Sequence, residues 1–191
     1  MKSRIKILAI ILLMIMFSCS DSKMQISTKN NFEIVKLPDG STAYLNCNGH
    51  IEYDKNFTQR VVKQNGEVFY DVTKGESPFF VKTEIGEIQV LGTKFNVRSN
   101  NNGLEVEVEE GVVELKINKF INKVKKGQKA FFKESKNEVK IYKAEFKHEK
   151  WIKNLDKEIK KLGKEISKSF NQIEKDSKKH WKEVKKEIES Y

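Results

Sequence analysis

Cys19 is the residue in this sequence with the clearest chemistry. It follows Met16-Phe17-Ser18, directly behind an unbroken apolar run from Ile7 to Phe17. A small residue and then a cysteine at this place resemble the lipobox that lipoprotein signal peptidase reads, and the thiol of such a cysteine takes diacylglycerol. Met16 stands where leucine is usual and keeps the apolar character. The sequence therefore predicts cleavage after Ser18 and lipid attachment, with palmitate-type acyl chains, at Cys19.

The residues ahead of Cys19 are organised like an export signal. Lys2, Arg4 and Lys6 form a positively charged start. The apolar run behind them has about half of the roughly 20 residues that a helix needs to cross a bilayer. We therefore expect residues 1–18 to be a lipoprotein signal peptide. An ordinary secretory signal with an incidental cysteine is the alternative.

Acyl chains on Cys19 would hold the mature chain to a membrane. Each buried CH₂ contributes about 0.8 kcal/mol, so several chains anchor stably where one does not. Ser20 occupies the position at which aspartate favours retention in the inner membrane of Gram-negative cells. We therefore expect a lipid-anchored protein of the cell envelope, at the outer membrane. Residues 19–31 are polar and aperiodic, which predicts a flexible tether.

The rest of the sequence has no recognisable catalytic or metal-binding set. His50, His148 and His180 have no acidic or cysteine partners at metal-ligand spacing. No nucleophile elbow, phosphate loop or pair of catalytic carboxylates stands out. With Cys19 acylated, Cys47 has no partner for an intrachain disulfide, and we expect it to be a small buried residue. The sequence predicts a protein with no enzymatic activity, no cofactor and no metal.

The formal net charge of +10 is divided along the chain. Three positive charges belong to the expected signal, the stretch 144–191 has a surplus of four, and the middle region holds the remaining three. A surplus this thin, interleaved with acidic residues, is typical of a solvated surface and not of a nucleic-acid-binding stripe. We therefore expect no nucleic-acid partner.

Residues 32–143 have the pattern of a β domain. Short apolar runs are separated by turn pairs such as Asp39-Gly40 and Asn65-Gly66, in which both positions tolerate positive φ. Leu104 to Val108 and Val112 to Ile117 alternate apolar and polar residues, as half-buried strands do. The sequence predicts a mainly β fold of many short strands, arranged as a sandwich, a barrel or a solenoid.

Residues 144–191 change to a helical pattern. Apolar residues recur every three or four positions from Ile152 to Tyr191, with Ser177 in the one position that is not apolar, and acids precede lysines by four residues, as in Asp156 with Lys160. This predicts a long amphipathic helix, or a helical hairpin if the chain breaks at Gly163, which costs about 1 kcal/mol in a helix interior. Three ways of burying the apolar stripe remain possible. Residues 147–191 could self-associate as a coiled coil, they could fold into the hairpin, or they could lie on an anionic membrane or lipopolysaccharide surface.

The β region resembles the FecR domain, the periplasmic sensor module of FecR-type anti-sigma regulators. The segments that carry the resemblance stand in the family's order and include Leu37-Pro38-Asp39-Gly40-Ser41, Arg60-Val61-Val62, Gly66-Glu67-Val68-Phe69-Tyr70-Asp71-Val72, Pro78-Phe79-Phe80-Val81, Val90-Leu91-Gly92-Thr93-Lys94-Phe95-Asn96-Val97, Glu110-Gly111-Val112-Val113 and Gly127-Gln128. The resemblance implies that the matching residues are the family's structural framework. These are Pro38, Asp39, Gly40, Arg60, Gly66, Glu67, Gly92, Thr93, Phe95 and Gly111.

The framework residues have a physical rationale, because glycines suit positive φ or close backbone approach. Arg60 and Glu67 flank one turn, and we expect them to pair. Such residues predict a fold, which does not by itself give a function.

The sequence departs from the family where the regulator's activity resides. The segment that holds a sigma factor and the membrane span that follows it are replaced by the short expected signal, so sigma-factor binding is not implied. A lysine-rich helix stands where the family has a small domain that contacts an outer-membrane transporter. We therefore hypothesise a lipid-anchored, non-catalytic binding or scaffold protein that holds an envelope protein or polymer. The alternative is a periplasmic sensor related to FecR-type anti-sigma regulators.

Overall fold

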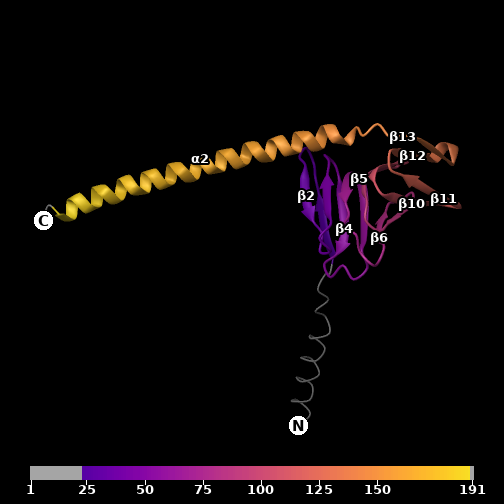
Figure 1. Ribbon diagram of the computed structural model, residues 1–191, viewed down its shortest axis with the longest axis horizontal. Helices are drawn as coiled ribbons and strands as arrows, with labels where there is room; N and C mark the ends of the chain where they lie inside the picture. Colours follow the sequence, from indigo (N-terminus) through magenta and orange to yellow (C-terminus); the bar gives the residue numbers. More distant parts are fainter. Residues whose placement is uncertain (1–22, 190–191) are drawn as a thin grey trace, which may run out of the picture. The chain divides into compact units, whose positions relative to one another are not determined.

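The computed structural model describes residues 23–189, and the side chains of residues 23–178 (Figure 1). The chain divides into two compact units with the boundary between Ala144 and Glu145. The expected signal peptide (1–18), Cys19 and the first residues of the expected tether lie outside the described residues. Within the described part, none of the helical segments has the length and apolar character that a membrane span requires.

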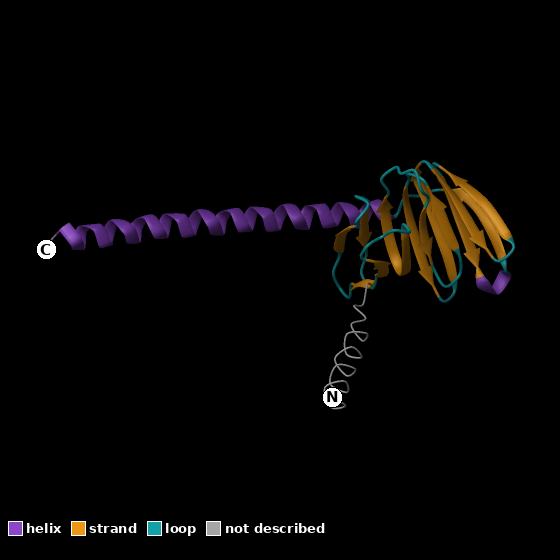
Figure 2. Cartoon of the chain, turned by 90° about the horizontal axis from the view of Figure 1, so that it is seen from below, coloured by secondary structure: helices purple, strands orange, loops and turns teal. Residues whose placement is uncertain are grey.

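The described residues of the first unit form thirteen strands, and Figure 2 shows their arrangement. In chain order they are β1 (Lys23–Ser27), β2 (Glu33–Lys36), β3 (Thr42–Leu45), β4 (His50–Asp54), β5 (Val61–Asp71), β6 (Phe79–Lys82), β7 (Glu87–Val90), β8 (Lys94–Asn100), β9 (Gly103–Glu110), β10 (Val112–Ile117), β11 (Phe120–Lys125), β12 (Gln128–Lys133) and β13 (Glu138–Lys143), with a short 3₁₀ helix η1 (Glu134–Lys136) before the last. The prediction of a mainly β fold with many short strands is confirmed.

The strands form two sheets that share β5. One sheet has the order β1-β4-β5-β6-β7-β10-β11, and the other has the order β2-β3-β5-β8-β9-β12-β13. Only β5 and β6 run parallel; the other pairs are antiparallel. β5 passes from one sheet to the other at Gly66, where φ is +83° and an added Cβ would lie 2.5 Å from the Asn48 carbonyl oxygen. Only glycine fits this bend without strain.

The inward-facing side chains of both sheets form one hydrophobic core. β9 buries Leu104, Val106 and Val108 completely, which is the alternation that the sequence shows. Tyr70 of β5 stacks on Phe95 of β8 with ring centroids 5.3 Å apart. Each fully buried side chain of this kind stabilises the fold by about 1.5–3 kcal/mol.

The expected tether contains a strand. All five residues of β1 pair with β4, and the Thr28 hydroxyl donates a 2.6 Å hydrogen bond to the Asn46 carbonyl oxygen. The prediction of a flexible tether over 19–31 is therefore wrong from Lys23 onward. β1 is an edge strand whose side chains are mostly exposed, and only Ile26 packs against the core. The apolar alternation that reveals a strand is consequently almost absent.

The second unit contains α2 (His148–Glu189), 42 residues long. At 1.5 Å per residue this helix extends about 63 Å. It continues through Gly163, so the hairpin prediction is wrong and the single long helix is correct. Its apolar stripe is between 45% and 69% exposed at the following residues: Ile159, Leu162, Ile166, Phe170 and Ile173.

Candidate functional site

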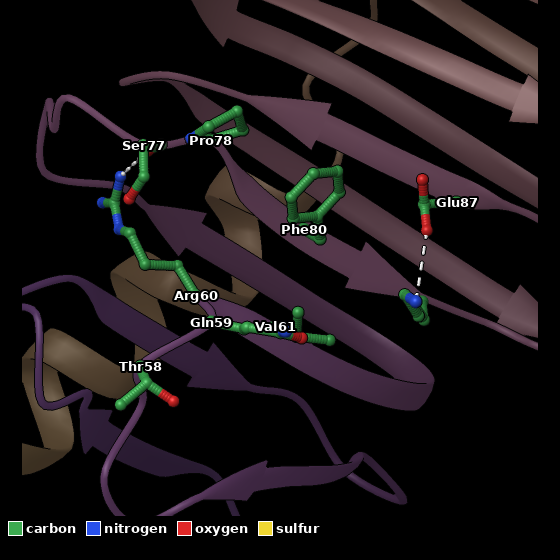
Figure 3. A pocket seen from close by; sticks show the side chains of 9 residues that line it. Thr58, Gln59, Arg60, Val61, Ser77, Pro78, Phe80 and Glu87 are labelled. Carbon is green, nitrogen blue, oxygen red and sulfur yellow. Dashed lines mark hydrogen bonds and ion pairs between the residues drawn. The ribbon is translucent and has the colours of Figure 1, made fainter.

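A pocket of about 420 Å³ opens where β5 begins (Figure 3). Val61, Pro78 and Phe80 supply its apolar surface. An ion pair between Lys82 and Glu87, 3.4 Å apart, lies on its wall. The lining residues are Thr58, Gln59, Arg60, Val61, Ser77, Pro78, Phe80, Lys82 and Glu87. A pocket of this size and mixed lining suits a small molecule or a single side chain of a partner.

Arg60 forms part of the pocket wall, and each nitrogen of its guanidinium group donates a hydrogen bond, of which Figure 3 shows the one to Ser77. Nε donates a 2.8 Å hydrogen bond to Asp39 Oδ2, Nη1 donates to the Ser77 carbonyl oxygen at 2.7 Å, and Nη2 donates to the Thr73 carbonyl oxygen at 2.6 Å. An added Cβ on Gly75 would lie 2.5 Å from Nη1. Arg60 therefore clamps the segment from Thr73 to Ser77 and is not available to bind an anionic ligand.

Asp39 is presented to Arg60 by a tight turn. Gly40 has a φ of +84°, and Asp39 accepts hydrogen bonds from the Ser41 backbone nitrogen and hydroxyl, both at 2.9 Å. Pro38 precedes this turn. The expected partner of Arg60 was Glu67, and that expectation is wrong. Arg60 directly precedes β5, whose first half pairs in one sheet, whereas Glu67 lies in the second half, which pairs in the other sheet.

Glu67 is the centre of a second buried polar cluster. It accepts hydrogen bonds from Asn46 Nδ2 at 2.8 Å, Asn96 Nδ2 at 3.0 Å and Arg98 Nη2 at 3.0 Å. Burial raises the pKa of Glu67, but the hydrogen bonds from Asn46, Arg98 and Asn96 outweigh burial and leave the pKa below its ordinary value. Glu67 is therefore a charged acceptor that holds β5 and β8 to the segment after β3.

Charged side chains continue this cluster across the second sheet. Arg98 lies 3.7 Å from Glu105, and Lys129 lies 3.7 Å from Glu105 and 3.9 Å from Glu107. Glu107 is buried although it is charged, because only 2% of it is exposed. Opposite charges on neighbouring strands stabilise this register of β8, β9 and β12.

The remaining framework residues pack the loops at the ends of β7 and β9. An added Cβ on Gly92 would lie 2.8 Å from Lys74 Cα, and one on Gly111, where φ is +86°, would lie 2.8 Å from Thr93 Oγ1. The Thr93 hydroxyl donates to the Val112 carbonyl oxygen at 3.2 Å, and Phe95 is fully buried. These contacts fix the backbone of the loops and the packing of the core, which is a structural role.

The other candidate residues do not come together. His50 Nδ1 lies 2.7 Å from the Ser27 hydroxyl, and the His148 ring packs edge-on against Phe146 in the second unit. The side chain of His180 lies outside the described residues. In the described part of the chain, no group of three or more histidine, cysteine or acidic side chains could hold a metal ion. Cys47 is a free thiol that is half-buried and not fully buried as expected.

Comparison with known proteins identifies the β unit. The FecR protein family matches residues 24–114. Two crystal structures of "a putative anti-sigma factor from Parabacteroides distasonis ATCC 8503" are similar at 27% sequence identity, with TM-scores of 0.61 and 0.60. The similarity covers 63% of this chain but only 60% and 59% of those chains. No curated protein matches the sequence.

The described β unit is thus a two-sheet domain that bends at Gly66, with clamped loops and a small pocket beside Arg60. The chain carries a FecR domain. This confirms the family resemblance seen in the sequence. The pocket beside Arg60 lies inside the matched region, whereas β11, β12, β13 and α2 lie beyond it.

Proposed function

We propose that this chain is a signalling component of the cell envelope, a sensor related to FecR-type anti-sigma regulators. The observation that carries this proposal is the FecR domain over residues 24–114, supported by the similarity to a protein described as an anti-sigma factor. These findings favour the sensor over the scaffold function that the sequence alone led us to prefer.

The pocket beside Arg60 gives the proposed sensor a place for its signal. A ligand seated against Phe80 and Pro78 would touch the chain next to Ser77, whose carbonyl oxygen Arg60 holds at 2.7 Å. Arg60 also holds Asp39 in the turn between β2 and β3. Ligand contact at the pocket would therefore act on both segments through one side chain. Arg60 would thus link the pocket to a turn that is 21 residues away in the sequence.

Transcript profiling tests the sensor function. Deletion of the gene should change the levels of a limited set of transcripts, and expression of the unchanged chain should restore them. A transcriptome that is the same with and without the gene, under conditions in which the protein is made, would remove the proposal.

Lipid attachment at Cys19 is the second part of the proposal. β1 begins at Lys23, four positions after Cys19. Four extended residues reach about 14 Å, so an acylated Cys19 would keep the β unit close to the bilayer, at the outer membrane as Ser20 indicates. Metabolic labelling with palmitate should mark the unchanged chain and not a Cys19→Ala variant. Equal labelling of both would contradict the anchor.

The exposed stripe of α2 favours a second candidate function, a scaffold that associates through this helix. Five apolar side chains at steps of three and four residues remain largely exposed. A second copy of the chain could cover them in a coiled coil. The oligomeric state of residues 20–191 should then fall on removal of residues 147–191. It should also fall with Ile166→Asp and not with Asn171→Asp, which adds the same charge on the far side of the helix. A monomer at all concentrations would exclude self-association.

A further inference from the structure

The charge of the β unit is separated along its sequence. Residues 23–115 contain ten basic and fourteen acidic residues, whereas residues 116–143 contain ten lysines and two acidic residues. The small surplus of the middle region as a whole concealed this division. The basic stretch corresponds to the end of β10 and all of β11, β12 and β13. It begins after the region that matches the FecR family, so it is a property of this chain rather than of the family framework.

Most of these lysines are exposed and lack an acidic partner. Eight are exposed, and we call them the lysine edge: Lys119, Lys123, Lys125, Lys126, Lys133, Lys136, Lys140 and Lys143. Only Lys140 has a carboxylate of the described residues within 4.0 Å, that of Glu138 at 3.3 Å. The lysine edge therefore concentrates positive charge that the β unit itself does not neutralise.

The lysine edge follows the outermost strands of both sheets and the turns beside them. β11 is the last strand of the first sheet, and β13 is the last strand of the second (Figure 1). The chain crosses directly between the sheets, because only Lys126 and Gly127 separate β11 from β12. At the other end of these strands, Asn118 Nδ2 donates a 3.3 Å hydrogen bond to Asn137 Oδ1. The two edges are thus tied together at both ends.

Apolar side chains are exposed among the lysines. Ile121 of β11 is 67% exposed, and Ile141 and Tyr142 of β13 are 41% and 48% exposed. Lysines alone would serve to protect an edge strand against pairing with another sheet. Large apolar side chains on the same two strands work against such protection, and they fit a surface that is covered when the protein is in place.

From this combination we infer that the lysine edge is a docking surface for an anionic lipid bilayer. Lysine is a compact point charge, suited to a diffuse field of phosphate headgroups rather than to bidentate recognition of one anion. Ile121 faces outward from the first sheet, and Ile141, which pairs with the core residue Ala130, points to the same side; these two side chains would enter the interfacial region between the headgroups. The proposed anchor at Cys19 would keep a bilayer within reach, and the surface itself does not depend on that anchor.

Vesicle binding of residues 20–191 tests this surface without the anchor, since this span keeps every residue that the structure describes. The edge variant replaces Lys123, Lys126, Lys133 and Lys136 by glutamate. The matched control replaces Lys157, Lys161, Lys164 and Lys168 of α2 by glutamate, with the same change in net charge. Flotation compares vesicles of phosphatidylcholine with vesicles that also contain phosphatidylglycerol. Circular dichroism checks that each variant is folded.

The unchanged span should bind only the vesicles with phosphatidylglycerol, less so at high salt because ions screen the attraction. Each lysine near the surface adds about fivefold to binding, so the edge variant should bind at least about a hundredfold more weakly. The α2 control should retain most of the binding, and Ile121→Ser should weaken it severalfold.

Three results would overturn the inference. The first is a lack of binding to anionic vesicles by the unchanged span. The second is an equal loss in the edge variant and the α2 control. The third is binding unaffected by Ile121→Ser and abolished by a soluble polyanion such as dextran sulfate, which would assign the surface to a charged polymer instead. None of these results bears on the transcript response, so this inference and the sensor function fail separately.

Discussion

Charged side chains serve different purposes in the β unit and in α2. Arg60 and Asp39 form an ion pair with only 9% and 12% of their side chains exposed, whereas Lys160 and Asp156 of α2 pair with 71% and 60% exposed. A buried charge that loses its partner remains desolvated, while an exposed one returns to water. We therefore expect the stability of the β unit to depend on a single ion pair such as that of Arg60 with Asp39, and the stability of α2 not to depend on the pair of Lys160 with Asp156.

The largest expected effect is that of Arg60→Ala. It would leave Asp39 and the carbonyl oxygens of Thr73 and Ser77 without their donor, so we expect a loss of about 3–5 kcal/mol in the free energy of unfolding. Lys160→Ala is the control, with an expected loss of at most about 0.5 kcal/mol. Urea unfolding, followed by the far-ultraviolet circular dichroism of the β structure, measures the free energy of unfolding of both variants. Similar losses in the two variants would invalidate the comparison.

Replacement of Glu67 should have the next largest effect. Glu67→Ala leaves Asn46, Asn96 and Arg98 without their common acceptor, at an expected cost of about 3 kcal/mol at neutral pH. The pKa of Glu67 is lowered in the folded state, so its stabilisation is present above the unfolded pKa of about 4.3 and is lost as the pH falls through the folded pKa.

The pH dependence separates this charge effect from simple loss of packing. The free energy of unfolding of the unchanged protein should decrease on acidification below about pH 4.3, and that of Glu67→Gln should decrease less over the same range. Urea midpoints at neutral and acidic pH give both values. Parallel pH profiles would show that Glu67 is not held in its charged form.

Gly163→Ala should stabilise α2 by about 1 kcal/mol, since glycine is the weaker helix former. The added Cβ would meet no atom within 4 Å. Thermal loss of the 222 nm signal should shift to higher temperature. A decrease in helix stability would mean that a contact requires glycine at this exposed position.

The smallest expected effect is that of Tyr70→Phe. The ring of Tyr70 is fully buried, and its hydroxyl has no hydrogen-bond partner among the described residues. Removal of the hydroxyl should leave the free energy of unfolding unchanged or raise it by less than about 1 kcal/mol. A loss of more than that in urea unfolding would reveal a partner for the hydroxyl.

Much of the fold could be predicted because its signals are local. The alternation in Leu104 to Val108 predicted β9, the Asp39-Gly40 pair predicted a turn, and the helical spacing from Ile152 onward predicted α2. The order of the matching segments then predicted the FecR domain. Each of these features depends on residues that are close together in the sequence.

The candidate site could not be predicted in the same way. Arg60 and Glu67 are near each other in sequence, but the bend at Gly66 sends the two halves of β5 into different sheets. The actual partner of Arg60 is Asp39, which a separate turn brings to it. The pocket is lined by residues from the start of β5, from β6 and from β7, and no local sequence pattern predicts that these segments lie together. The lysines of the lysine edge stand in the sequence, but the net charge was averaged over the whole middle region, and this average did not show that the lysines are concentrated in residues 116–143.

Complementation with a pocket variant tests the central claim, that this FecR domain acts as a sensor, most directly. Phe80→Ala removes the aromatic wall of the pocket, and Ile34→Ala is the matched control on β2, whose side chain is 38% exposed. In a strain that lacks the gene, the unchanged chain and Ile34→Ala should restore the transcript pattern, and Phe80→Ala should not, at equal protein levels. Full restoration by Phe80→Ala would contradict signalling through this pocket.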